Sequence, residues 1–153
     1  MVSQSLRATS GVFRVDGLLP GTVTAVLKTA NHAPVSFSLV VGDGDTVEYS
    51  GPCFEVEGAV AGKLVDANGT PVVRARLEIE YQERLVEVGM LEELATGRKW
   101  TDEGGRFEVK GLVPRAPFWL RFNGIRTVEG PFVVDTGERR DLSEVTAPPA
   151  AAR

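Results

Sequence analysis

An aromatic segment near residue 120 is the best candidate for a binding surface in this chain of 153 residues. Apolar residues occupy the first, third and fifth positions of the run 118–122, which predicts that Trp119 and Arg121 point away from the core. An outward tryptophan beside a polar group is a platform on which a sugar ring can stack. Trp100 offers a second platform, so the candidate ligand-binding residues are Trp119, Arg121 and Trp100. The competing interpretation, which we favour, is that Trp119 packs against residues 82–96 or against the N-terminal part of the chain.

Residues that could perform catalysis are few. His32 is the only histidine and lies in a loop sequence, so we interpret it as a solvated polar residue. Cys53 is the only cysteine and has no second histidine to activate it, which favours an inert thiol over a nucleophile. Asp43 and Asp45 alternate with glycines, a combination that favours a backbone turn over a calcium loop. We therefore expect no catalytic residues, no bound metal and no cofactor.

Composition and charge exclude several other classes of protein. The chain is 42% hydrophobic and 25% charged with a net charge of −4, as is typical of a soluble globular protein. Lysine and arginine do not cluster, so we expect no nucleic-acid partner. No apolar run is long enough to span a bilayer, and the first seven residues lack the apolar core of a secretory signal. Any export signal would lie outside this chain.

The hydrophobic pattern has a period of two along most of the chain. Val35, Phe37 and Leu39 alternate with serine and valine, and Leu77 and Ile79 alternate with glutamate. Such alternation over short stretches, separated by turn sequences rich in glycine, asparagine and aspartate, is typical of strands with one buried face. Residues 87–95 are expected to form a strand and loop or a single helical turn. The sequence thus predicts an all-β, antiparallel Greek-key β-sandwich.

The chain contains an internal repeat. Residues 11–20 match residues 105–114 at six of ten positions, including both glycines and the proline. After the proline, one extra residue in the second copy shifts the alignment by one. The alignment then matches Phe118 with Val23, Phe132 with Phe37, and Gly137 with Gly42.

The repeat divides the chain into unequal parts. Residues 1–51 correspond to the rear half of a module, residues 52–147 to a complete module, and residues 148–153 to a linker tail. A half-sandwich has no second sheet to cover its apolar face, so we expect cover from the neighbouring module, from a second copy of the chain, or from strands upstream. The half is explained most simply as a piece of a longer tandem protein. The alternative is an open edge that recruits a partner by strand addition.

Several segments of the complete module resemble a known family. The segments are 62–72, 75–79, 101–107 and 111–114. Together they resemble the carboxypeptidase regulatory-like domain, which implies a transthyretin-like sandwich grouped with carbohydrate-binding-like folds. Members are accessory modules of secreted or surface proteins, so the resemblance implies an extracellular, cell-surface or periplasmic location. Arg115 departs from the family pattern, because it stands where the first copy keeps the usual glycine, Gly21.

The resemblance implies a role without catalysis. The peptidase activity associated with the family name belongs to a separate zinc domain, whose two-histidine-plus-glutamate ligation this chain does not offer. We therefore expect a non-catalytic spacer or interaction unit in a larger exported protein. Its expected partners are neighbouring repeats or host-protein domains, and a second copy could pair with the open half. The alternatives are a carbohydrate-binding module and a regulatory domain that supports a peptidase located elsewhere.

Overall fold

The computed structural model describes residues 14–49, 54–83 and 95–149, and within those ranges the secondary structure is entirely β. This confirms the predicted all-β class. The strands are β1 (Gly21–Leu27), β2 (Val35–Val41), β3 (Gly58–Val65), β4 (Leu77–Tyr81), β5 (Thr96–Arg98), β6 (Arg106–Leu112), β7 (Phe118–Phe122), β8 (Ile125–Arg126) and β9 (Arg139–Thr146). No helix long and apolar enough to cross a membrane occurs in the described part of the chain. Cys53 and residues 84–94, which hold most of the segment expected as a helical turn or loop, lie outside it.

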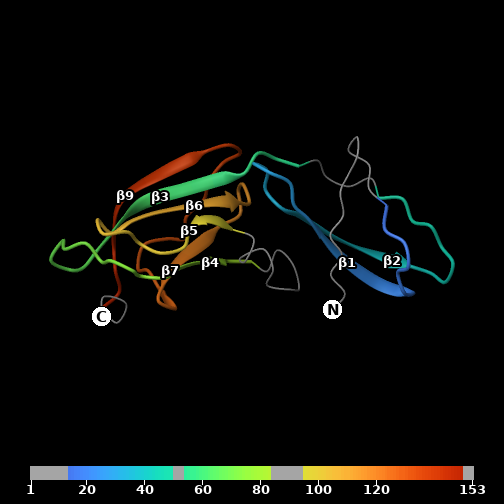
Figure 1. The fold of residues 1–153 in the computed structure, drawn as a ribbon, viewed down its shortest axis with the longest axis horizontal. Helices are drawn as coiled ribbons and strands as arrows, with labels where there is room; N and C mark the ends of the chain where they lie inside the picture. The colour runs from blue at the N-terminus through green and yellow to red at the C-terminus, as the bar shows by residue number, and fades with distance from the viewer. Residues whose placement is uncertain (1–13, 50–53, 84–94, 150–153) are drawn as a thin grey trace.

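Seven of the strands form the two layers of a sandwich. One sheet has the order β5-β6-β3-β9 and the other the order β4-β7-β8, and the hairpin β1-β2 lies beside them at one end of the molecule (Figure 1). All pairs are antiparallel except β3 and β9, which run parallel. The purely antiparallel expectation is therefore wrong at this edge, because alternation indicates which face of a strand is buried and carries no information on the direction of its neighbour.

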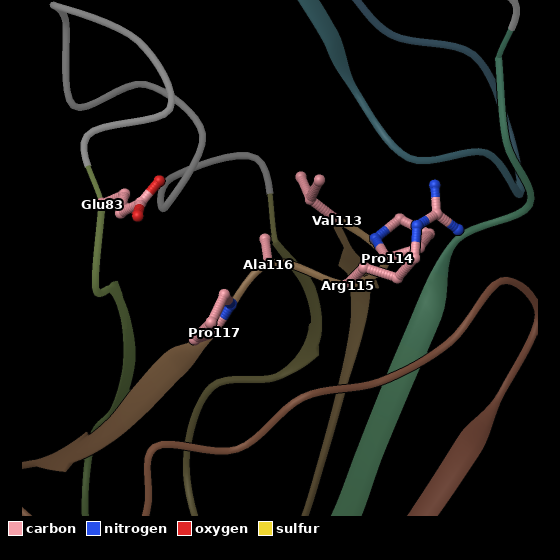
Figure 2. A pocket seen from close by; sticks show the side chains of 6 residues that line it. All are labelled: Glu83, Val113, Pro114, Arg115, Ala116 and Pro117. Carbon is pink, nitrogen blue, oxygen red and sulfur yellow. The ribbon is translucent and has the colours of Figure 1, made fainter.

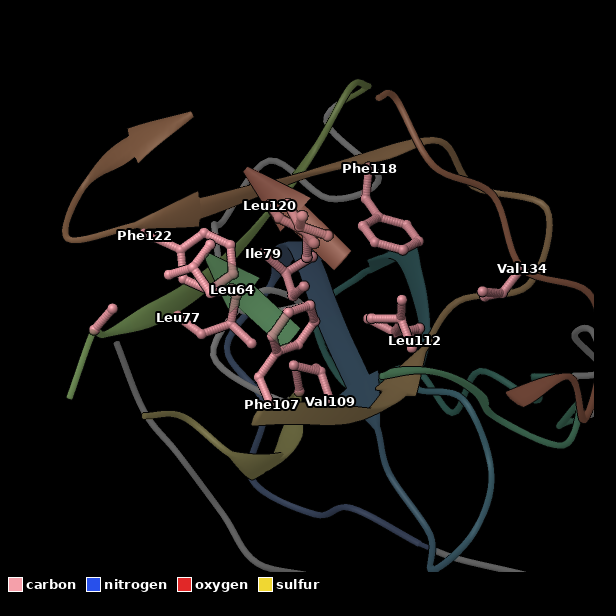
Figure 3. Close-up of a cluster of buried hydrophobic side chains, with 14 of the residues drawn as sticks. Leu64, Leu77, Ile79, Phe107, Val109, Leu112, Phe118, Leu120, Phe122 and Val134 are labelled. Carbon is pink, nitrogen blue, oxygen red and sulfur yellow. The ribbon is translucent and has the colours of Figure 1, made fainter. Parts of the chain in front are cut away.

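The core lies between the two sheets. The three apolar side chains of β7, those of Phe118, Leu120 and Phe122, are fully buried, as the alternation predicted. They face side chains of the four-stranded sheet (Figure 3), and the rings of Phe107 and Phe122 meet edge to face across the layers at 5.4 Å between centroids. Burial of these large side chains is the main force that holds the layers together.

The turn before β6 is closed by one carboxylate. Asp102 accepts hydrogen bonds from the backbone N–H groups of Gly104 (2.9 Å) and Arg106 (2.8 Å), and it forms an ion pair with Arg98. The hydrogen bond from Arg106 is the main reason that the pKa of Asp102 lies below its usual value, and the contacts with Gly104 and Arg98 act in the same direction. The ionised form of Asp102 therefore stabilises the turn.

The hairpin β1-β2 has a continuous register from Gly21 opposite Val41 to Leu27 opposite Val35. Most of its apolar side chains are only half-buried, and Val40 is 72% exposed. Val26 packs against the core cluster of the sandwich. Within the described residues no further strand pairs with β1 or β2, which form a two-stranded sheet of their own.

The two aligned stretches share unusual backbone angles. Gly17 and Gly111 occupy matching positions and have φ values of +75° and +77°. The next matched pair, Gly21 and Arg115, also have positive φ, at +134° and +60°. Only the first pair shares a conformation, because φ near +60° is the left-handed region and φ near +134° is not.

The turns after β2 and after residue 134 are also alike. Gly42 donates its N–H to the carboxylate of Asp45, and Asp45 donates its own N–H to the carbonyl of Gly42. Asp135 and Glu138 form the same pair of bonds, with a left-handed glycine at the third position in each turn.

This likeness corrects the alignment beyond β1. Phe118 pairs with Phe132 where Val23 pairs with Leu39, so the counterpart of Phe132 is Leu39 and not Phe37. Likewise, the counterpart of Gly137 is Gly44 and not Gly42. The physical reason is spacing: Val23 and its partner Leu39 are 16 positions apart, whereas Phe118 and its partner Phe132 are 14 positions apart. The stretches also differ: residues 14–18 and 46–49 are outside strands, while their counterparts, 108–112 and 139–142, lie in β6 and β9.

Truncation of Leu120 tests the core. We expect Leu120→Ala to lower the free energy of unfolding by about 2–5 kcal/mol, because it removes a fully buried side chain and leaves a cavity. Val128→Ala is the matched control, since Val128 is 84% exposed and its truncation should change stability by less than about 0.5 kcal/mol. Chemical denaturation measures both, and equal losses would contradict the assignment of the core.

The pH dependence of stability tests the Asp102 turn. A carboxyl group whose pKa is lowered by folding stabilises the protein above its unfolded pKa of about 3.9, and this contribution is lost as the pH falls through the lower folded pKa. We expect Asp102→Asn to be less stable than wild type at neutral pH and to lose less stability on acidification below about pH 4. Glu103→Gln removes the same charge from the same turn and serves as the control in denaturation at several pH values. Parallel pH profiles for wild type and Asp102→Asn would contradict this role.

Candidate functional site

The outer face of the three-stranded sheet carries most of the predicted binding residues. The register places Glu78 opposite Arg121, Glu80 opposite Trp119, and Arg121 opposite Arg126. Because the intervening residues of β4 and β7 are buried, these side chains point away from the core. We call these five residues the outer face.

Trp119 is half-buried on the outer face by its own chain. The guanidinium carbon of Arg126 lies 4.8 Å from the centre of a Trp119 ring, which is a cation–π contact. Gly130 lies so close that an added Cβ would be 3.0 Å from the indole Cε3. Trp119 thus packs against Arg126 and Gly130, which are not among the partners expected for it, residues 82–96 or the N-terminal part of the chain. Residues 84–94 lie outside the described part of the chain. A sugar ring would have to displace Arg126 to stack on the face that it covers.

Arg121 is held by a turn and by a carboxylate. Its Nε donates to the carbonyl of Gly124 at 3.0 Å, and Nε also lies 3.6 Å from a carboxylate oxygen of Glu80. Glu80 also accepts a charged hydrogen bond from Arg126. The carbonyl of Gly124 and the carboxylate of Glu80 therefore orient the guanidinium of Arg121, which remains partly exposed.

Trp100 joins the same surface from a neighbouring segment. It forms an antiparallel bridge with Arg76, next to the hydrogen bond from Leu77 N–H to the Lys99 carbonyl at 2.8 Å. Because Ala75 and Leu77 are buried, Arg76 points outward, and its bridge partner Trp100 shares that side. Trp100 is 54% exposed, so its ring is accessible to solvent.

The three sequence-predicted residues share one face without forming one pocket. Trp100 is paired with Arg76, just before β4, and Trp119 is paired with Glu80 in β4. These partners are four positions apart, which corresponds to about 13 Å along a strand. The ion pairs of Glu78 and Glu80 occupy the space between them.

A shallow hollow of about 350 Å³ lies at one end of the sandwich. It is lined by Glu83, Val113, Pro114, Arg115, Ala116 and Pro117 (Figure 2). The only charged groups in this lining are those of Glu83 and Arg115, and Arg115 is already bound to another carboxylate.

That carboxylate is the side chain of Glu55. Glu55 lies in the segment between hairpin and sandwich, residues 54–57, which we call the joint. Arg115 Nη2 lies 2.8 Å from both carboxylate oxygens of Glu55, and Nη1 donates to the Thr136 hydroxyl at 3.1 Å. The hydrogen bond with Glu55 is the main cause that raises the pKa of Arg115 above its usual value. In the sequence, Arg115 stands out only because it replaces a glycine, and no sequence pattern indicates Glu55 as its partner.

The backbone of the joint is bonded on two sides. Ala33 donates to the carbonyl of Glu55 at 2.8 Å, and Glu57 donates to the carbonyl of Asn31 at 3.2 Å, which ties the joint to the loop of the hairpin. On the other side, Gly137 donates to the carbonyl of Val56 at 3.3 Å. The joint is therefore an extended segment bonded to both parts of the chain.

His32 lies in the hairpin loop and contacts the joint. Its ring Nδ1 lies 2.8 Å from the carbonyl oxygen of Ala30, and the ring meets Phe54 edge on at 6.2 Å between centroids. His32 is half-buried, and its ring contacts both the hairpin loop and the joint.

Asp45 closes the turn after β2 by accepting the N–H of Gly42 at 3.1 Å, in agreement with its interpretation as a turn residue. Within the described ranges there is no group of three or more histidine, cysteine or acidic residues that could hold a metal ion.

Comparison with known proteins gives little further guidance. No family model and no curated protein sequence matches the chain. The chain is similar to part of the crystal structure of a 9R-lipoxygenase from Cyanothece PCC8801, with a TM-score of 0.40 and 19% identity over 60% of this chain. It spans 16% of that enzyme's length.

Proposed function

We propose that the chain is a non-catalytic accessory module that acts as a spacer or interaction unit in a larger exported or surface protein. In this proposal, residues 52–147 are a complete transthyretin-like module of the carboxypeptidase regulatory-like type, and residues 1–51 are the rear half of another. The observation that carries the proposal is the joint, because a spacer must fix the relative position of the parts that it connects.

The contacts of the joint support a fixed connection. Arg115 adopts φ = +60°, a conformation that costs free energy for a residue with a Cβ. In that conformation its guanidinium binds Glu55, and its own N–H donates to the carbonyl of Val134 at 2.8 Å. A freely moving linker would need neither the ion pair nor the backbone bonds to Asn31 and Ala33.

Duplication of the module is supported by backbone conformation as well as by sequence. The matching positive φ values at Gly17 and Gly111, and the matching turns at 42–45 and 135–138, occur at equivalent places in the two stretches. Modules that repeat in tandem commonly build stalks and spacers, which agrees with the role that the resemblance implies.

Amide exchange tests the joint directly. We expect Arg115→Gly and Glu55→Gln to speed hydrogen exchange of the Ala33 and Glu57 amides by about two- to five-fold, the range that a partly exposed ion pair supports. Arg139→Ala is the matched control, because it removes an ion pair with Glu108 that joins β9 to β6 and includes no residue of the joint. Unchanged exchange at Ala33 and Glu57 in both joint variants would argue against a fixed spacer.

A carbohydrate-binding role is the second candidate, and the exposure of Trp100 favours it. Trp100 presents an open ring on the same face as Trp119 and Arg121, although Arg126 covers Trp119. The other alternative, a regulatory domain for a peptidase, stays a prediction from the resemblance.

Binding to a glycan array separates this candidate from the spacer role. If the outer face binds sugars, we expect Trp100→Ala to weaken binding by about ten-fold through loss of stacking, and Trp119→Ala to weaken it less. The Arg139→Ala variant should bind as wild type does. Binding that survives both tryptophan changes, or no binding by wild type, would remove the stacking role.

A further inference from the structure

We propose that the edge of β1 with which no described strand pairs accepts an extended peptide strand in which apolar and polar residues alternate as they do in β4. The proposal concerns a binding edge and its partner, and it rests on the structural equivalence of β1 and β7. It goes beyond the spacer role, which depends on the joint.

The complete module shows what occupies this position. In the sandwich, β7 lies between two neighbours, because β4 pairs with one edge while β8 and Phe132 pair with the other. In the hairpin, β1 pairs with β2 along one edge. This edge corresponds to the edge of β7 that pairs with Phe132, because Val23 pairs with Leu39 as Phe118 pairs with Phe132. Its second edge has no partner in the described part of the chain. The missing neighbour of β1 therefore corresponds to β4.

The register defines the incoming strand. In the sandwich, the paired residues are Leu77 with Phe122, Ile79 with Leu120, and Tyr81 with Phe118. By equivalence, an antiparallel strand would place apolar residues opposite Leu27, Ala25 and Val23, whose side chains are half-buried. The residues between them would face outward, where β4 carries Glu78 and Glu80.

The hydrogen-bonding groups of β1 are arranged for this pairing. Phe118 and Phe132 exchange two backbone hydrogen bonds, of 2.9 and 2.8 Å, so the corresponding pair of Val23 and Leu39 is a hydrogen-bonded pair. The backbone groups of the next residue, Thr24, then point toward the free edge. Its hydroxyl lies 3.0 Å from that of Ser38 across the pair, as suits the closer side chains of a non-hydrogen-bonded position.

The edge also lacks the usual protection against strand addition. Natural edge strands carry charges, proline or bulges that discourage pairing with another chain. The sequence of β1, Gly21–Leu27, contains no charged residue and no proline, and its register with β2 is continuous. An extended peptide can therefore pair along its full length.

Two proline variants test the proposal on the full chain. Thr24→Pro removes an N–H that points to the free edge of β1, and Ser38→Pro removes an N–H that points to the opposite edge of the hairpin. Both variants also lose the same hydroxyl contact between residues 24 and 38, so they are matched. The probe is a fluorescently labelled peptide with the sequence of residues 75–83, whose affinity is measured by fluorescence polarisation.

We expect the peptide to bind wild type and Ser38→Pro with similar affinity, and Thr24→Pro at least about ten-fold more weakly, since a lost ladder bond and a steric block act together. A peptide carrying Ile79→Asp should bind weakly to all three proteins. In the wild-type complex, the amide resonances of Thr22, Thr24 and Val26 should shift most in NMR spectra.

Other results would overturn the proposal. These are no binding to wild type, or an equal loss in both proline variants while the thermal unfolding of the sandwich is unchanged. A wild-type dimer in light scattering that Thr24→Pro converts to a monomer would show that a second copy occupies the edge instead. Hydrogen exchange of the Ala33 and Glu57 amides should be the same in Thr24→Pro as in wild type, because the variant does not touch the joint. A failure of the strand-addition proposal can therefore be told apart from a failure of the spacer role.

Discussion

Burial of alternate side chains on β7 is the constraint on which the rest of the sandwich depends. Phe118, Leu120 and Phe122 fill the space between the sheets, and this fixes the direction of every other side chain on the strand. A slip of one residue would bury Trp119 and Arg121 and expose three large apolar groups. The outer face is thus a consequence of the core, and its charged pairs form where the register of β4 and β8 places them.

The period of two was sufficient to predict the all-β class and the buried face of β7, because these depend on the pattern within a single strand. It did not predict that β3 and β9 pair in parallel. It also did not predict that the counterpart of Phe132 is Leu39, two residues after Phe37. Both depend on how separate strands meet, and local alternation is the same for either arrangement.

The candidate site shows the same division. The alternation of apolar and polar residues along β7 predicted that Trp119 and Arg121 point outward, and the structure places Trp100 on the same side of the sheet. The contacts that decide what these residues can do come from elsewhere, as with Arg126 over Trp119. In the joint, Glu55 and Arg115 are sixty positions apart, so no spacing rule could pair them. The one available signal was arginine at a position where the repeat has glycine.

The two aligned stretches differ in the size of their inward side chains, and the difference bears on the partner strand proposed for β1. Where β7 has Phe118 and Leu120, β1 has the smaller Val23 and Ala25, so the hairpin supplies less apolar surface of its own. A partner strand with large apolar residues, as in Leu77, Ile79 and Tyr81 of β4, would compensate for that loss on the same face. The joint ties the hairpin loop to the sandwich through Asn31 and Ala33, which lie beyond β1, so these backbone bonds use none of the groups that the proposed strand would need.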